Sequence, residues 1–96
     1  MKKDVITVKE YCHIHQVDVA FIDSLEESGL VQLVSVDQQR CIPHTALGVV
    51  ERLVNWHIEL EVNPQGLEVA NALYQRVLEL QAEVTQLRSA LKNAIE

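Results

Sequence analysis

The chain has 96 residues, of which 48% are hydrophobic but 4% aromatic, and its formal net charge is −6. This length allows at most one domain, with a core built from aliphatic side chains. The acidic balance argues against non-specific attraction to DNA, RNA or anionic lipid, because all three need a positive surface. No apolar run is long enough to span a membrane, and no apolar segment follows the N-terminal lysines as in a secretory signal. We therefore expect a soluble, cytoplasmic protein.

Two short helices are predicted near the N-terminus. Thr7 is a typical N-cap with Glu10 as its capping-box partner, which predicts a helix over residues 8–15. A second helix is predicted over residues 19–28, with Gly29 in the left-handed position that follows many helices. The second helix has an apolar face made of Phe21, Ile22 and Leu25. Two short helices joined by a turn of about three residues are typical of a helix-turn-helix.

A hairpin and a third helix are predicted next. The stretch LVQLVSVDQQRCIP is rich in β-branched and aliphatic residues, and Asp37-Gln38-Gln39 interrupts it. It favours a two-stranded hairpin, or wing, that ends at Pro43. A third helix is predicted from about His44 to Glu61. Its wide apolar stripe consists of Leu47, Val50, Leu53, Val54, Ile58 and Leu60.

The last helix carries the strongest periodic pattern. Asn63 is a good N-cap and Pro64 suits the first helical position, so we expect a helix from there to Ile95, roughly 48 Å long. We divide the chain into a domain over residues 1–62 and a dimerisation helix over residues 63–96. Apolar residues alternate at three and four positions along a predicted dimer seam: Ala70, Leu73, Val77, Leu80, Val84, Leu87, Leu91 and Ala94.

The seam leaves two questions open. The same stripe would also suit a terminal helix that packs on its own domain, but the helix is longer than the small domain beside it. A homodimer is therefore expected. Valine and leucine at the two seam positions suit a parallel pair, in which Glu83 would meet Arg88 across the seam. An antiparallel pair is equally possible sterically.

The charges oppose the usual DNA-binding role of a helix-turn-helix. The second helix carries Asp23, Glu26 and Glu27 and no Lys or Arg. Through residue 56 the chain has five basic residues (Lys2, Lys3, Lys9, Arg40 and Arg52) against eight acidic ones (Asp4, Glu10, Asp18, Asp23, Glu26, Glu27, Asp37 and Glu51). Phosphate neutralisation supplies most of the affinity for duplex DNA, so an acidic helix would be repelled. The acidic face is either simply solvated or receives a basic partner helix.

Other constellations favour structural roles. Cys12 and His15 would share a helix face, and Cys41 from the wing would complete a conceivable metal cluster, but buried reduced thiols explain both cysteines better. A catalytic Cys-His pair is less favoured still, because the chain offers little from which to build a pocket and an oxyanion site. We therefore expect no catalytic residues, no metal and no cofactor. Trp56 suits a core anchor or an interface contact, and we expect it half-buried against the helix junction.

The stretch ITVKEYC…VDVAFIDSLEESGLV resembles the winged-helix start of MerR-type regulators. The resemblance rests on Val17, Ile22, the Glu26-Glu27 pair and the Gly29-Leu30 turn. The chain departs from that family at Ala20 and Asp23, where arginines are typical, and at Ser24 and Leu25, where a tyrosine pair is typical.

Over nearly its whole length, the chain is similar to the narrower chaperone modulator CbpM family. The matching features are ITVKEYC, the acidic helix ending in SGLV, the short wing, HTALGVVERLVNWHIELEVN, the turn before Gly66-Leu67 and the closing heptads. This resemblance implies a mostly α fold: a MerR-like winged helix-turn-helix with a small β-hairpin wing and a long C-terminal coiled-coil helix.

The CbpM resemblance also implies a function. Members bind the J-domain of the DnaJ-like co-chaperone CbpA and inhibit its co-chaperone activity and its DNA binding. The J-domain's basic helix normally docks on the Hsp70 chaperone DnaK, so an acidic modulator would compete with DnaK. The candidate contacts are Asp23, Glu26 and Glu27, with a rival patch of Glu51, Glu59, Glu61 and Glu68. The alternatives are a MerR-type DNA-binding transcriptional regulator and an adaptor for another basic protein.

Overall fold

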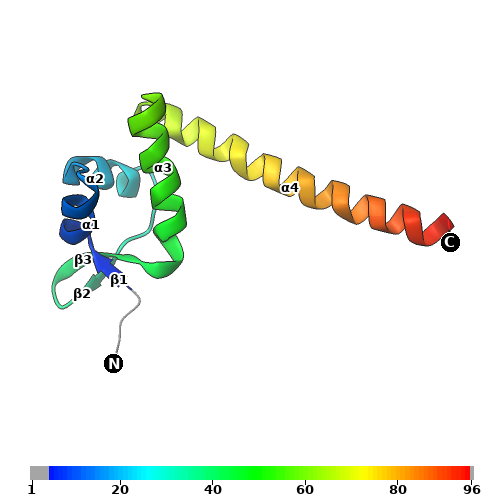
Figure 1. Cartoon of the computed structure of the whole chain (residues 1–96). Helices are drawn as coiled ribbons and strands as arrows, with labels where there is room; N and C mark the ends of the chain where they lie inside the picture. The colour runs from blue at the N-terminus through cyan, green and yellow to red at the C-terminus, as the bar shows by residue number, and fades with distance from the viewer. Residues whose placement is uncertain (1–4, 96) are drawn as a thin grey trace.

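The computed structural model describes residues 5–95 as a small mixed domain from which one long helix extends (Figure 1). The elements in chain order are β1 (Val5–Thr7), α1 (Val8–His15), α2 (Val19–Glu27), β2 (Val34–Val36), β3 (Gln39–Pro43), the 3₁₀ turn η1 (His44–Ala46), α3 (Leu47–Leu60) and α4 (Pro64–Ile95). The described chain measures 57 × 38 × 21 Å, and its radius of gyration is 17.5 Å. A compact chain of this length would have a radius near 12.5 Å, so α4 is what elongates the molecule.

The first helix begins and ends where the sequence predicts. The Thr7 side chain accepts a hydrogen bond from the backbone N–H of Glu10 at 3.0 Å, and the Glu10 carboxylate accepts one from the backbone N–H of Thr7 at 3.4 Å. This reciprocal capping box satisfies two donors that the first turn of a helix leaves unpaired. The capping residues therefore fix where α1 begins.

The end of α2 is set by a glycine. Gly29 adopts a φ of +80°, and its N–H donates to the carbonyl of Glu26 at 3.0 Å. The N–H of Leu30 donates to the carbonyl of Leu25 at 3.0 Å, which completes a Schellman motif. The helix ends at Glu27, one residue earlier than predicted, because Ser28 serves as its C-cap.

The hairpin is present, and a third strand joins it. The strands lie in the order β1-β3-β2, and both pairings are antiparallel. Asp37 and Gln38, at the tip, have φ values of 52° and 64°. Two successive positive φ values form the turn type that joins two strands most tightly. The hairpin prediction is confirmed, whereas β1 was not expected, because three residues carry no recognisable alternation.

The core lies between α1, α2, α3 and the inner face of the sheet. Its buried side chains are Val8, Tyr11, Cys12, Phe21, Ile22, Leu25, Val31, Ile42, Val50, Leu53, Val54 and Leu67. The apolar face predicted for α2 and the middle of the α3 stripe are therefore confirmed.

The two ends of the α3 prediction need correction. The helix begins at Leu47 rather than His44, because residues 44–46 form a tighter 3₁₀ turn. Ile58 and Leu60 were predicted in the buried stripe but are 53% and 67% exposed. The last turn of α3 runs past the small core, so the apolar pattern continues where nothing in the described chain covers it.

The start of α4 follows the predicted capping. The Asn63 side chain accepts a hydrogen bond from the backbone N–H of Gly66 at 2.7 Å, and Pro64 is the first helical residue. Leu67 is the buried residue through which α4 reaches the core. Among the described helices, none is both long and apolar enough to cross a membrane.

Candidate functional site

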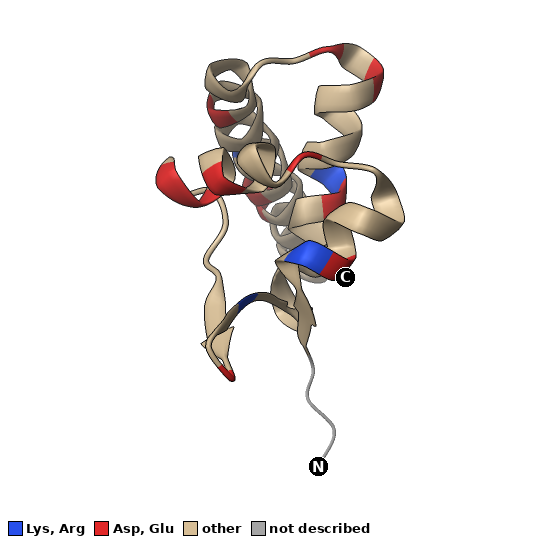
Figure 2. Cartoon of the chain, turned by 90° about the vertical axis from the view of Figure 1, so that its left-hand side faces the viewer, with Lys and Arg blue, Asp and Glu red and all other residues tan. Residues whose placement is uncertain are grey.

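The outward face of α2 carries the acidic group predicted from the sequence. Asp23 is half-buried, and Glu26 and Glu27 are exposed. Figure 2 shows the distribution of charge: acidic residues recur on the helical surface, and basic residues are few. Within the described residues 5–62, Lys and Arg occur only as Lys9, Arg40 and Arg52. The second helix of this helix-turn-helix therefore presents carboxylates where phosphate-binding cations would be needed.

The structure shows that two of these carboxylates are already paired. The guanidinium of Arg40, on β3, forms ion pairs with the carboxylates of both Asp23 and Glu26, the latter at 3.1 Å. The hydrogen bond to Asp23 is the main reason why the pKa of Arg40 is raised above its ordinary value. All three side chains remain about two-fifths exposed. Glu27 makes no ion pair within the described chain.

The sequence could not predict this contact. Asp23 and Glu26 are three residues apart on one helix, which places them on one face. Arg40 lies 14 residues beyond Glu26 and reaches it only because β3 folds back beside α2. The acidic character of α2 could be predicted from the sequence, but the ion pairs with Arg40 depend on the tertiary fold.

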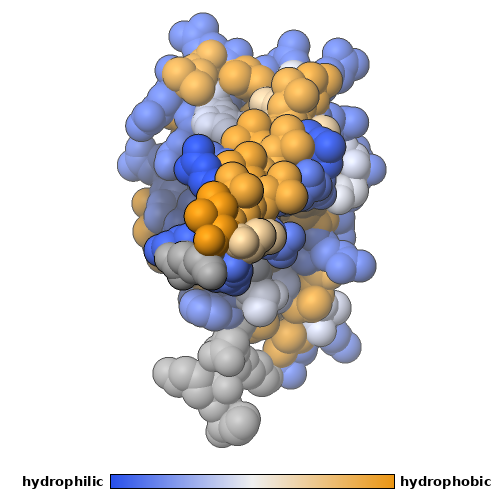
Figure 3. Space-filling model, turned by 90° about the vertical axis from the view of Figure 1, so that its right-hand side faces the viewer, coloured by the Kyte–Doolittle hydropathy of each residue, from blue (hydrophilic) through white to orange (hydrophobic). Residues whose placement is uncertain are grey.

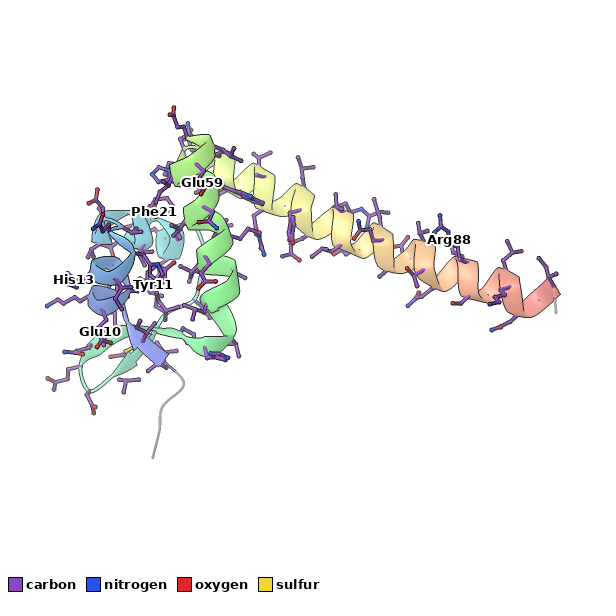
Figure 4. All side chains as sticks on the ribbon, in the orientation of Figure 1. Glu10, Tyr11, His13, Phe21, Glu59 and Arg88 are labelled. Carbon is purple, nitrogen blue, oxygen red and sulfur yellow. The ribbon has the colours of Figure 1, made fainter. Side chains whose placement is uncertain are left out.

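The rival acidic residues are spread along two elements. Glu51 lies in the middle of α3, Glu59 in its last turn, Glu61 at its C-cap and Glu68 early in α4. All four are exposed, and Figure 4 shows Glu59 in the upper part of α3. Eight residues of helix separate Glu51 from Glu59, about 12 Å along the axis. These side chains are therefore spread over α3 and the start of α4 and do not form one tight cluster.

The junction between α3 and α4 is held by a cationic and aromatic cluster. The Arg52 guanidinium lies 4.2 Å from the centre of the Tyr74 ring and 5.7 Å from that of Trp56. It also donates a hydrogen bond to the Asn71 side chain at 2.9 Å. Trp56 and Tyr74 pack edge to face with ring centres 5.7 Å apart. Trp56 is half-buried at this junction, as predicted, whereas the role of Arg52 was not anticipated.

The predicted dimer seam is an exposed apolar stripe on α4. Ala70, next to α3, is half-buried, whereas the following seam residues are exposed, including Leu73 at 62% and Leu87 at 68%. Figure 3, which looks toward the C-terminal end of α4, shows hydrophobic side chains gathered in a continuous band. The exposed members of the stripe are Leu73, Val77, Leu80, Val84, Leu87, Leu91 and Ala94. Contiguous exposed apolar patches are uncommon on soluble proteins unless they bind another surface, so this stripe is a candidate interface.

The two cysteines are buried free thiols, as expected. Burial raises the pKa of the Cys12 thiol, and the nearby carboxylate of Asp23 adds to the effect. A raised pKa keeps a thiol protonated and unreactive near neutral pH. Across residues 5–95, no group of three or more His, Cys, Asp and Glu side chains is arranged to hold a metal ion.

Comparison with known proteins places this architecture in a family. No curated protein and no solved structure matches the chain significantly. The family model described as MerR HTH family regulatory protein matches residues 6–89, which include both helices of the helix-turn-helix, the wing, α3 and most of α4. The chain therefore belongs to the MerR HTH family of regulatory proteins.

Proposed function

We propose that this protein is a chaperone modulator that binds the J-domain of a CbpA/DnaJ-like co-chaperone. Binding would inhibit the co-chaperone activity and the DNA binding of that partner, by competition with the Hsp70 chaperone DnaK. Membership of a family of regulatory proteins agrees with a regulator that is not an enzyme. The CbpM resemblance supplies the identity of the partner.

The observation that carries the proposal is the charge of α2. Its exposed face combines Asp23, Glu26 and Glu27, and the nearest cation, Arg40, is engaged by two of them. A recognition helix of this kind repels phosphate and attracts Lys and Arg. The basic helix that a J-domain presents to DnaK has the complementary charge.

The proposed mechanism needs only steric and electrostatic competition. A modulator that covers the basic helix of the J-domain removes the surface that DnaK requires. Opposite charges steer the encounter, and salt weakens the steering because it screens exposed charges. We further propose that the protein is a homodimer through the α4 stripe, which would give the active unit two copies of each acidic surface.

A calorimetric titration with the isolated J-domain tests the proposal. We expect saturable binding that weakens between low and high salt. Asp23→Lys and Glu27→Lys should weaken it about tenfold or more if α2 is the contact, because like charges across an interface are costly. Glu59→Lys should do so instead if the rival surface is the contact. Glu79→Lys is the matched control, because Glu79 pairs with Arg76 on α4, outside both acidic groups.

The family match also favours a second function, that of a DNA-binding transcriptional regulator. A DNA reader should be retained on a heparin column and elute at high salt. We expect the protein to pass through such a column at pH 7. Retention on heparin, together with no heat on adding the J-domain, would overturn the modulator proposal and support the DNA reader.

A further inference from the structure

We propose that Arg40 is an intramolecular latch that occupies the acidic face of α2 until a basic partner displaces it. This inference rests on the proposed function and adds a regulatory step to it. In the free protein, the guanidinium holds the carboxylates of Asp23 and Glu26 together. It fills the position that an Arg or Lys of the partner would take.

The contact has the geometry of an exchangeable ion pair. Asp23 and Glu26 lie on successive turns of α2, and one guanidinium spans both carboxylates. The side chains of Arg40 and of both partners are each about two-fifths exposed. The three side chains therefore lie at the surface, where salt screens them, although the Asp23 oxygen in the contact is itself buried. A surface ion pair contributes little to stability, so a competing cation has little free energy to replace.

The wing tip, residues 34–40, lies at the surface, so it can move away from α2. Every residue in it is exposed except Val36, which is half-buried. Burial begins at Cys41 and Ile42, which anchor the base of β3 in the domain. None of these residues belongs to the core, so movement of Arg40 away from α2 displaces no core side chain.

The displaced guanidinium also has room to move. Arg40 lines a groove of about 530 Å³ between the start of α1, the start of α2 and the wing. Lys9 and Glu10 line the same groove and are exposed, and the Glu10 carboxylate is held by Thr7 in the capping box. A partner that takes over Asp23 and Glu26 therefore leaves Arg40 beside an open, partly polar space. Glu27, which makes no ion pair within the described chain, remains available for the first encounter.

A pair of arginine variants of the full chain tests the latch. Arg40→Gln removes the latch, and Arg76→Gln is the charge-matched control. Arg76 pairs with Glu79 at 3.0 Å on α4, so both variants lose one positive charge from an exposed ion pair, although Arg40 pairs with two carboxylates and Arg76 with one. Each is titrated with the J-domain and, separately, with an oligolysine peptide. We expect Arg40→Gln to bind both probes about three- to tenfold more tightly than Arg76→Gln does.

The two probes separate this inference from the proposed function. Tight J-domain binding that is equal in Arg40→Gln and Arg76→Gln would overturn the latch and leave the modulator function standing. Absence of J-domain binding, with the expected difference for oligolysine, would overturn the function and support the latch. Weaker binding by Arg40→Gln than by Arg76→Gln for either probe would mean that Arg40 builds the surface rather than blocks it, and would overturn the latch. Equal affinities of Arg40→Gln and Arg76→Gln for both probes would also overturn the latch.

Discussion

Gly29 is the one glycine of the described chain whose left-handed backbone ends a helix. The sequence predicted that ending because glycine adopts a positive φ without steric cost. Gln16 and Glu61, which cap α1 and α3, adopt φ values of 55° and 56° without being glycine. Residue type gives no signal at those two positions, since their conformation follows from the path that the packed helices require.

Two glycine substitutions should have opposite effects on stability. Gly29→Ala is expected to lower the free energy of unfolding by about 1 kcal/mol, because alanine is strained at φ +80°. Gly48→Ala is expected to raise it by about 0.5 to 1 kcal/mol, because Gly48 lies in the first turn of α3. Beyond the adjacent residues and the local helix backbone, a Cβ at either position would meet no atom within 4 Å, so tertiary packing does not enter the comparison. Urea unfolding measures both values, and equal signs for the two variants would contradict the argument.

The candidate site was predictable only in part at the residue scale. Helical spacing placed Asp23, Glu26 and Glu27 near one another, and their polarity predicted a surface position. The ion pairs with Arg40 come from the fold of the hairpin, which brings β3 beside α2. Arg40 is far from Asp23 and Glu26 in the sequence, so the sequence alone does not show that these two carboxylates are paired and that Glu27 is not.

At the scale of elements, helices were predicted better than strands. The capping residues Thr7 and Asn63 fixed the starts of α1 and α4, because capping is a local interaction. The strand β1 pairs with β3 through residues more than thirty positions away, so no local pattern announces it. The apolar stripe of α3 predicted its buried middle but not its exposed end, because periodicity does not show where a core stops.

The junction of α3 and α4 yields a prediction of its own. Arg52→Ala should lower the free energy of unfolding by about 1 to 2 kcal/mol, since it removes a hydrogen bond to Asn71 and stacking on Tyr74. Arg52→Lys should not restore the loss, because an ammonium group lacks the planar fork. Urea unfolding followed by the fluorescence of Trp56 measures the effect. Asn55→Ala, at an exposed position on α3, is the control, and a loss as large as that of Arg52→Ala would argue against a specific cluster.

At the scale of the whole molecule, the exposed apolar stripe on the extended α4 helix is the surface that the proposed dimer would bury. A 32-residue helix whose side chains are exposed from Gln75 onward has little tertiary packing of its own. Most helices in proteins depend on such packing for their stability. The heptad pattern predicted this feature from the sequence, because period and length are both readable there. The direction in which two copies of α4 would pair is not encoded as plainly.

The stripe can be tested by substitution on opposite faces of α4. Leu80→Glu should convert the proposed dimer into a monomer, because a buried charge in the seam is unfavourable. Ala82→Glu, on the opposite face, should leave the dimer intact. Sedimentation velocity distinguishes the two masses, and circular dichroism checks that the domain remains folded. Leu80 is 42% exposed in the single chain, so an unchanged mass for Leu80→Glu would show that no second copy covers this stripe.

Because α4 is long and largely unpacked in the single chain, the fraction of molecules in which it is folded should depend on protein concentration. If a second copy supplies the packing that this helix lacks, the helix is stabilised by mass action, and its melting temperature rises with protein concentration. The core that residues 5–62 form with Leu67 of α4 needs no second copy, so it would be less sensitive to concentration than the rest of α4. Dilution would then melt the chain from its C-terminal end, in two transitions rather than one. The number of copies in a cell would set how many of them carry an ordered α4.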